Sequence, residues 1–312
     1  MGTGNTLAGR SLLTLADLSP FELRDLLALA TDLKRGAVHV DLSGRVLGLL
    51  FRKASTRTRV SFSAAIAQCG GTVIDLMPNT MQVSRGESVA DTARILSGYL
   101  DVLAIRTFEQ TELEEFASYA HIPVINALTD TYHPCQILAD LLTIDEIFGQ
   151  LRDVTVTYCG DGNNVAHSLI LGCVLAGAHV RVASPVKYAP DATILERAKA
   201  IAAAGNTGST VSLYTDPLEA AAGAQVLYTD VWASMGQEEM AASRLSLFEP
   251  YQINARLLDR ADPDAIVLHC LPAHRGEEIT AEVLEGSRSR VWQQAENRLH
   301  AQKALLAGIL SD

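Results

Sequence analysis

The sequence predicts an α/β protein with two doubly wound parallel-sheet domains and a C-terminal helix that packs back on the first domain. Short apolar runs alternate with amphipathic stretches along the chain, which is typical of parallel sheets covered by helices on both faces. The alternation occurs in two successive series, and 312 residues suffice for two domains of ordinary size. The apolar fraction of 48% and the charged fraction of 20% are those of a globular protein, which disfavours disordered, collagen-like and coiled-coil architectures.

The first helix has a well-marked beginning and end. Ser19 is a candidate N-cap, Pro20 stands at the first helical position, and Glu22 completes a capping box. Apolar residues then recur at helical spacing until Gly36, which is expected to end the helix.

The first series of strands and helices follows this helix. Strands are predicted at residues 46–51, 72–76, 102–105 and 124–127. Helices are predicted at residues 58–68, 88–100 and 112–120, and a long helix at 134–148 leads into the second series.

The second series is equally regular. Its strands are predicted at residues 154–159, 179–183, 211–214, 226–228 and 266–269, with helical stretches between most of them and a last helix at 293–310. Two series indicate two domains with a hinge near residues 145–152. We expect residues 1–147 with the C-terminal helix at 293–312 to form the first domain, and residues 148–292 to form the second.

The composition excludes several classes of protein. Lys and Arg number 25 against 36 Asp and Glu, a net charge of -11, which disfavours a nucleic-acid binder or a protein that docks on an anionic membrane. No apolar run approaches the length of a membrane span. The five cysteines form no CxxC pair, so we expect reduced thiols in a cytoplasmic protein and no metal site.

The segment that follows the first predicted strand is strongly basic, although the chain as a whole is acidic. Four cations fall within eight residues there, and the segment opens a helix: Arg52, Lys53, Arg57 and Arg59. A helix N-terminus presents unpaired N–H groups, and an arginine can bind two phosphate oxygens at once. Ser55, Thr56 and Thr58 add hydroxyl donors, so this segment predicts a phosphate site, although it contains no GxxxxGK motif.

Four motifs in order make a family resemblance specific: residues 55–59 (Ser-Thr-Arg-Thr-Arg), 133–136 (His-Pro-Cys-Gln), 230–236 (Asp-Val-Trp-Ala-Ser-Met-Gly) and 269–272 (His-Cys-Leu-Pro). Together they resemble the motifs of the ornithine carbamoyltransferases. The resemblance extends along the chain from the first helix to Arg298. The third motif resembles the ornithine-binding loop that distinguishes these enzymes from the aspartate carbamoyltransferases. The resemblance implies transfer of the carbamoyl group of carbamoyl phosphate to the δ-amine of L-ornithine, which yields L-citrulline and phosphate, in arginine biosynthesis or in the reverse catabolic direction. It implies no cofactor and no metal.

The resemblance also assigns residues to carbamoyl phosphate: Ser55, Thr56, Arg57, Thr58, Gln82, Arg106, His133, Gln136, Cys270, Leu271 and Arg298. Arg57, Arg106, His133 and Cys270 are the implied catalytic residues. His133, Arg106 and Thr58 can donate hydrogen bonds to the carbonyl oxygen, where negative charge develops. Gln82 is implied to reach its ligand across a subunit interface, so a homotrimer with shared active sites is expected. We expect Arg52, Lys53, Arg57, Arg59, Arg106 and Arg298 to gather positive charge in one cleft.

For ornithine the resemblance implies Asn164, Asp230, Ser234 and Met235. Asn164 can donate to the substrate carboxylate, and Asp230 can accept from the α-ammonium. Cys270 is expected beside the δ-amine without forming a covalent intermediate, and the Leu271 carbonyl is expected to face the carbamoyl amide. The δ-amine reacts only when neutral, and a comparable lysine amine titrates near about 10.4, so activity is expected to rise toward alkaline pH.

Three alternatives remain open at this point. A nicotinamide dehydrogenase is suggested by Gly160-x-Gly162 after a strand, but Val165 stands where the fingerprint expects Gly or Ala. A second alternative is a transferase that acts on acetylated or succinylated ornithine, aspartate or putrescine; Asp230 disfavours the acylated amines because an amide carries no cation. A non-catalytic relative that only binds or regulates is the third.

Overall fold

A computed structural model describes residues 6–81, 86–232 and 241–311. The chain divides into two compact units, Met1–Ala139 with Asn297–Asp312 (unit 1) and Asp140–Glu296 (unit 2). The chain passes from unit 1 to unit 2 inside α5 (Pro134–Phe148) and returns inside α12 (Val291–Leu310). Both passages therefore lie within continuous helices.

Unit 1 contains a parallel sheet with the strand order β2-β1-β3-β4. Its strands are β1 (Val46–Phe51), β2 (Thr72–Leu76), β3 (Val102–Arg106) and β4 (Val124–Leu128). β1 is central and almost entirely buried, whereas β2 is an edge strand that is half exposed. The order places β2 on one side of β1 and the later strands on the other, so the direction of the connections reverses between β1 and β3.

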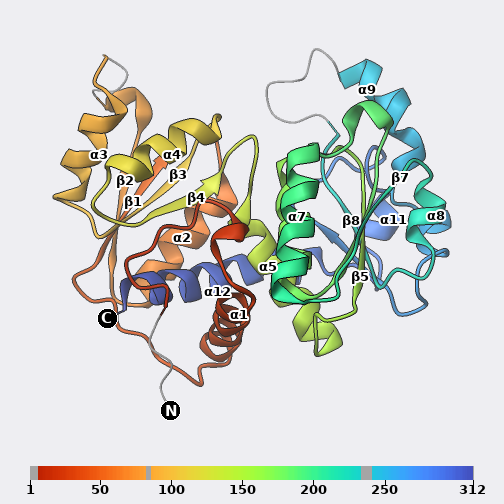
Figure 1. Ribbon diagram of the computed structural model, residues 1–312, viewed down its shortest axis with the longest axis horizontal. Helices are drawn as coiled ribbons and strands as arrows, with labels where there is room; N and C mark the ends of the chain where they lie inside the picture. Colours follow the sequence, from red (N-terminus) through yellow and green to blue (C-terminus); the bar gives the residue numbers. More distant parts are fainter. Residues whose placement is uncertain (1–5, 82–85, 233–240, 312) are drawn as a thin grey trace. The chain divides into compact units, whose positions relative to one another are not determined.

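Helices cover this sheet on both faces, as Figure 1 shows. They are α1 (Pro20–Arg35), α2 (Thr56–Gln68), α3 (Val89–Ser97) and α4 (Gln110–Tyr119), together with the unit 1 parts of α5 and α12. α3 and α4 bury Ala93, Leu113 and Phe116 against Leu50 and Ile105 of the sheet. The capping box of α1 is confirmed, because the Ser19 hydroxyl accepts from the Glu22 amide and the Glu22 carboxylate accepts from the Ser19 amide at 2.8 Å.

The C-terminal helix packs on the first unit, as predicted. Asn297 of α12 accepts a hydrogen bond from Lys34 of α1 at 2.7 Å, and Lys303 of α12 donates to Gln68 of α2. These contacts place α12 beside helices that precede it by more than two hundred residues.

Unit 2 contains a second parallel sheet, with the strand order β7-β6-β5-β8-β9. Its strands are β5 (Thr155–Cys159), β6 (His179–Ala183), β7 (Val211–Tyr214), β8 (Val226–Thr229) and β9 (Ile266–His269). The connections reverse direction between β5 and β8. The predicted fold class, two doubly wound parallel-sheet domains, is confirmed.

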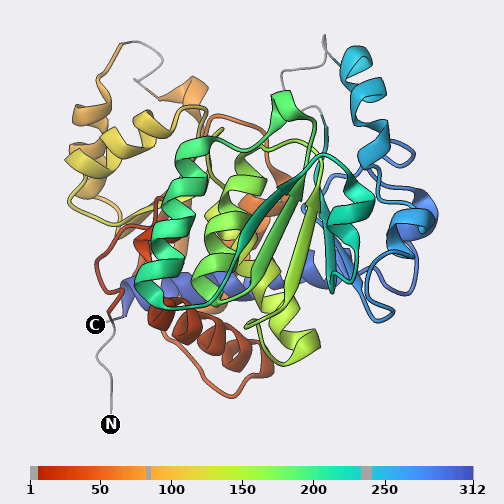
Figure 2. The same ribbon diagram turned by 45° about the vertical axis from the view of Figure 1, so that its right-hand side comes forward.

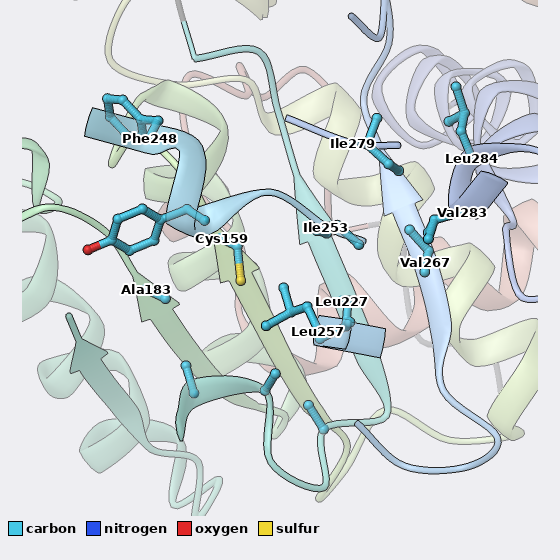
Figure 3. Packing of buried hydrophobic residues seen from close by; sticks show 14 of the residues in the cluster. Cys159, Ala183, Leu227, Phe248, Ile253, Leu257, Val267, Ile279, Val283 and Leu284 are labelled. Carbon is cyan, nitrogen blue, oxygen red and sulfur yellow. The ribbon is translucent and has the colours of Figure 1, made fainter. Parts of the chain in front are cut away.

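Helices also cover both faces of the second sheet; α7 lies on one side, and α8 and α11 lie on the other (Figures 1 and 2). They are α6 (Asn164–Ala176), α7 (Ala192–Gly205), α8 (Pro217–Ala221), α9 (Ala241–Phe248), α10 (Ala255–Leu258) and α11 (Ala281–Leu284). Short 3-10 helices are η1 (Leu15–Asp17), η2 (Pro78–Thr80), η4 (Val186–Tyr188) and η6 (Glu249–Tyr251). Figure 3 shows Cys159, Leu227 and Val267 of the strands packed with Phe248 and Leu257 of the later helices.

Two features of the described residues bear on function. All five cysteines lie among them, and none forms a disulfide. Within residues 6–81, 86–232 and 241–311, no helix combines the length and the apolar character needed to cross a membrane.

The start of α2 differs from the prediction. The helix predicted to start at residue 58 begins at Thr56, with Ser55 as its N-cap. The polar segment 55–58 is therefore the first turn of α2 rather than a loop before it.

Candidate active site

In unit 1, the predicted phosphate segment lies at the point where the strand order reverses. The residue after β1, Arg52, donates its backbone N–H to the carbonyl of Arg106 at the end of β3, at 2.8 Å. Ligands of open parallel sheets bind at such reversals, beyond the carboxyl ends of the strands. Ser55 makes no capping hydrogen bond with its side chain. The first N–H groups of α2 have no acceptor within the helix itself, and they lie beside the hydroxyls of Ser55 and Thr56 and the exposed Arg57.

Three predicted site residues from distant segments, Thr58, Gln136 and Arg298, are joined by hydrogen bonds. The buried Arg298 of α12 donates to Gln136 Oε1 of α5 at 2.6 Å and to Thr58 Oγ1 of α2 at 2.6 Å. Both acceptors are neutral oxygens, so these bonds orient the guanidinium without cancelling its charge. We call Ser55, Thr56, Arg57, Thr58, Arg106, His133, Gln136 and Arg298 the anion site.

His133 is the one histidine of the anion site, and it is buried. Burial holds the pKa of His133 well below its usual range, and the positive charges of Arg298, Arg106 and Arg57 lower this pKa further. The imidazole is therefore neutral at pH 7. A neutral imidazole can donate one N–H to a carbonyl oxygen, and it adds no charge to a site already rich in arginine.

Three of the six cations expected to gather positive charge have that charge balanced by neighbouring carboxylates. They are paired with carboxylates: Arg52 with Glu112 at 2.5 Å, Lys53 with Asp130, and Arg59 with Asp75. These pairs neutralise charge beside the site, because each cation has an anion in contact. The positive charge acting on His133 comes from Arg57, Arg106 and Arg298 instead.

In unit 2, Asp230 follows β8 directly, again at the point where the strand order reverses. One oxygen of its buried carboxylate accepts from the Val231 amide at 2.8 Å and from the Cys270 thiol at 2.7 Å. The other oxygen accepts from the side-chain amide of Asn163 at 2.8 Å. We call Asn163, Asp230 and Cys270 the Asp230 cluster.

Asn163 holds Asp230 in place, and sequence reasoning missed it in favour of its neighbour. Its Oδ1 caps α6 by accepting from the amides of Val165 at 3.0 Å and Ala166 at 3.2 Å, which turns its NH₂ group toward Asp230. The predicted Asn164 is the first residue of α6. The two adjacent asparagines after a strand were the available signal: Asn163 caps the helix, and the role of Asn164 stays a prediction.

Gly162, just before Asn163, serves packing in this structure. A Cβ at Gly162 would lie 2.3 Å from the backbone nitrogen of Pro190, so no side chain fits there. The Gly162 amide also donates to the Tyr188 carbonyl at 2.8 Å. The second glycine of the half fingerprint that suggested a nicotinamide dehydrogenase is thus explained by a close approach of two backbones.

A second residue that the sequence did not single out is Arg244 of α9. It is buried, lies over the rings of Tyr188 and Phe248, and forms an ion pair with Asp161. Burial raises the pKa of Asp161, and the contact with Arg244 opposes that rise. This pair joins the loop after β5 to α9.

Cys270 and Leu271 follow β9. Cys270 contacts Asp230, and the Leu271 amide donates to Nδ1 of His269 at 2.8 Å. Leu271 has a φ of 57°, in the left-handed region that a leucine seldom adopts. The predicted site residues Gln82, Ser234 and Met235 lie outside the described residues.

Comparison with known proteins identifies the family. The carbamoyl-phosphate binding domain of the aspartate/ornithine carbamoyltransferases matches residues 10–146, and their aspartate/ornithine binding domain matches residues 152–309. The chain belongs to the aspartate/ornithine carbamoyltransferase family. The predicted family is thereby confirmed.

Individual members of the family are similar over almost the whole chain. The ornithine carbamoyltransferase of Synechococcus elongatus is 65% identical over 304 residues, which is 97% of this chain and 98% of that protein. The crystal structure of the Gloeobacter violaceus enzyme of that name is 58% identical, with a TM-score of 0.89, over 98% of this chain and 100% of that one. The ornithine carbamoyltransferase of Pyrococcus furiosus is 48% identical, with a TM-score of 0.93, over 97% and 98%.

Proposed function

We propose that this protein is an ornithine carbamoyltransferase, which moves the carbamoyl group of carbamoyl phosphate to the δ-amine of L-ornithine and releases L-citrulline and phosphate. The observation that carries the proposal is the contact between Asp230 and Cys270 at 2.7 Å, because it provides an anion for an amino-acid ammonium beside a strand end that carries a polarisable thiol. The near-full-length similarity to ornithine carbamoyltransferases supports the same substrate pair.

Carbamoyl phosphate is assigned to the anion site. The N-terminus of α2, with Ser55, Thr56 and Arg57, would bind the phosphate and stabilise it as a leaving group. Thr58, Arg106 and His133 would donate to the carbonyl oxygen, which gains negative charge when the amine attacks. Gln136 and Arg298 would complete the ligand set.

Ornithine is assigned to unit 2. Asp230 would accept from the α-ammonium, and Asn164 at the start of α6 would donate to the carboxylate. Ser234 and Met235 are proposed to complete this set. Cys270 and the carbonyl of Leu271 would face the δ-amine and the carbamoyl group. The neutral δ-amine attacks the carbonyl carbon, the C–O bond to phosphate breaks, and the amine proton leaves with phosphate or solvent.

The proposal extends to domains and assembly. We assign residues 1–147 and 293–312 to carbamoyl phosphate and residues 148–292 to ornithine, in a homotrimer whose active sites receive Gln82 from a neighbouring subunit. Apolar side chains exposed on and near the edge strand β2 support an interface on unit 1: Ile74, Met77, Ile95 and Tyr99. Sizing should give about three times the monomer mass. Mixing Arg57 and Gln82 variants should restore activity, and a fully active monomer would refute the shared site.

We place this reaction in the cytoplasm, because five cysteines without a disulfide are typical of a reducing compartment. Its direction would be arginine biosynthesis or the reverse breakdown of citrulline, since one active site serves both.

A panel of amine acceptors tests the function. Purified protein with carbamoyl phosphate at pH 8.5 should form citrulline from ornithine and no carbamoylated product from N-acetylornithine, N-succinylornithine, aspartate or putrescine. A product from another acceptor would reassign the substrate. No product from any acceptor would favour the non-catalytic alternative, and fluorescence quenching on titration with NADH would revive the dehydrogenase.

A further inference from the structure

A buried histidine–glutamate pair lies next to the Asp230 cluster, and the roles assigned above do not use it. His269, the last residue of β9, and Glu278 are both almost completely buried. Nε2 of His269 lies 2.9 Å from Oε1 of Glu278. The same oxygen accepts from the His274 amide at 2.6 Å, so Glu278 ties together the two ends of the segment 269–274.

The hydrogen bonds assign the proton of His269. The Leu271 amide donates to Nδ1 at 2.8 Å, so Nδ1 is an acceptor and carries no proton. The proton of the neutral ring is therefore on Nε2, where it is donated to Glu278. If the proton moved to Nδ1, the Nδ1–H and the backbone N–H of Leu271 would both be donors and could not bond to each other, so the Leu271 amide would have to move away.

The position of that amide decides where the neighbouring groups point. Leu271 has a left-handed φ of 57°, and a leucine needs support to hold this conformation. The support at its nitrogen is His269, whose own backbone N–H is held by the side chain of Gln294 at 2.9 Å. The orientation of the Leu271 carbonyl and of the adjacent Cys270 thus depends on which ring nitrogen of His269 is protonated.

The stability of the folded protein does not by itself explain a carboxylate at residue 278. Oε2 of Glu278 is buried and accepts no hydrogen bond within the described residues. Removing a carboxylate from water is costly when only part of its hydrogen-bonding capacity is used, and an apolar side chain would fill the same space without that cost.

We propose that Glu278 is a positioning residue: by fixing the tautomer of His269, it orients the Leu271 peptide and Cys270 toward the reacting carbamoyl group. This inference rests on the proposed function, which assigns those two residues to the site. It predicts an effect on the chemical step, whereas phosphate binding in unit 1 stays unchanged.

Substitutions at residue 278 separate positioning from structural support. Glu278→Gln keeps an uncharged acceptor and should lower kcat by about tenfold, because the bond to a charged acceptor is the stronger one. Glu278→Leu removes the acceptor and should lower kcat by about 100-fold or more. The affinity for inorganic phosphate, measured by calorimetry, should stay within about threefold in both variants. Glu277→Gln is the matched control, because the side chain of this neighbouring residue is 45% exposed and its carboxylate lies 3.5 Å from Nδ1 of His274, away from His269. The kcat of this variant should equal that of the wild type.

A double-mutant cycle tests whether the effect passes through His269. His269→Asn keeps an acceptor near the Leu271 amide but cannot reach Glu278, so adding Glu278→Gln to it should cost no further kcat. Multiplicative losses in the double variant would overturn the proposal. So would a kcat for Glu278→Gln equal to that of the wild type, or a loss explained by a fall in melting temperature alone.

A readout that does not need turnover keeps this test separate from that of the proposed function. Long-range ¹H–¹⁵N spectra of protein labelled at histidine should show His269 protonated at Nε2 in the wild type. Protonation at Nδ1 would refute the positioning role even in an active enzyme. If the spectra show the Nε2 proton and no citrulline forms, the proposed function fails on its own.

Discussion

The two units build their sites at the same place in the fold but with opposite charge. In each, the loops that follow two adjacent strands meet where the strand order reverses. Unit 1 places arginines there, and Arg298 among them donates to the neutral oxygens of Gln136 and Thr58. Unit 2 places a carboxylate there, and it accepts from an amide, a backbone N–H and a thiol. One architecture thus serves opposite ligands, because only the few residues after the strands set the sign of the site.

The strongest test of this contrast removes one charge from unit 1. Arg57→Gly should lower kcat/KM by about 1,000-fold or more, because the variant loses a charged double hydrogen bond to the leaving phosphate. Arg59→Gly is the matched control in the same helix, with the same loss of helix propensity. Since Arg59 is paired with Asp75, its loss should cost less than about fivefold. Similar steady-state losses in the two variants would contradict the assignment of Arg57 to the phosphate.

The pH dependence should differ between the two substrates. Arginines stay charged throughout, whereas the δ-amine must lose a proton, so kcat/KM for ornithine should rise about 100-fold from pH 6.5 to 8.5. Phosphate-analogue binding should change little between pH 7.5 and 8.5. Initial rates at subsaturating ornithine measure the first quantity, and a flat profile from pH 6 to 10 would show that proton loss does not limit the reaction.

A matching test removes the negative charge of Asp230 in unit 2. Asp230→Asn should raise the KM for ornithine by about 50-fold, because a buried partner of the ammonium is lost. Calorimetric binding of phosphate serves as the internal control and should be unchanged. An unaltered KM would mean that the ammonium binds elsewhere.

The smallest effect concerns the stability of unit 1. The folded pKa of His133 is depressed below the unfolded value of about 6.5, so between these two values the unfolded chain binds the proton more readily. The contribution of the neutral His133 to the free energy of unfolding is complete above about pH 6.5. It is lost as the pH falls toward the folded pKa, by up to about 1.4 kcal/mol per pH unit. Urea unfolding at one protein concentration should therefore show a steeper acid loss in the wild type than in His133→Gln. Parallel curves would indicate that His133 takes up its proton equally readily in the folded and the unfolded chain.

Local sequence signals predicted most of the fold and much of the site. The Ser19–Glu22 capping box, the alternation of apolar runs and the motifs after the strands are all set by neighbouring residues. The partners of Arg52, Lys53 and Arg59 could not be predicted, because Glu112, Asp130 and Asp75 come from other segments. The hinge near residues 145–152 stays a prediction; the two compact units divide inside the continuous helices α5 and α12, where no turn residue marks the division.

The split of unit 1 along the chain has a consequence for its synthesis. Arg298, which joins Thr58 and Gln136 in the anion site, is translated after every residue of unit 2. A ribosome-bound chain that has already produced both sheets still lacks this guanidinium and the part of α12 that packs on α1 and α2. Nascent chains should therefore gain their affinity for phosphate in one late step, when the last helix emerges, rather than as each domain folds.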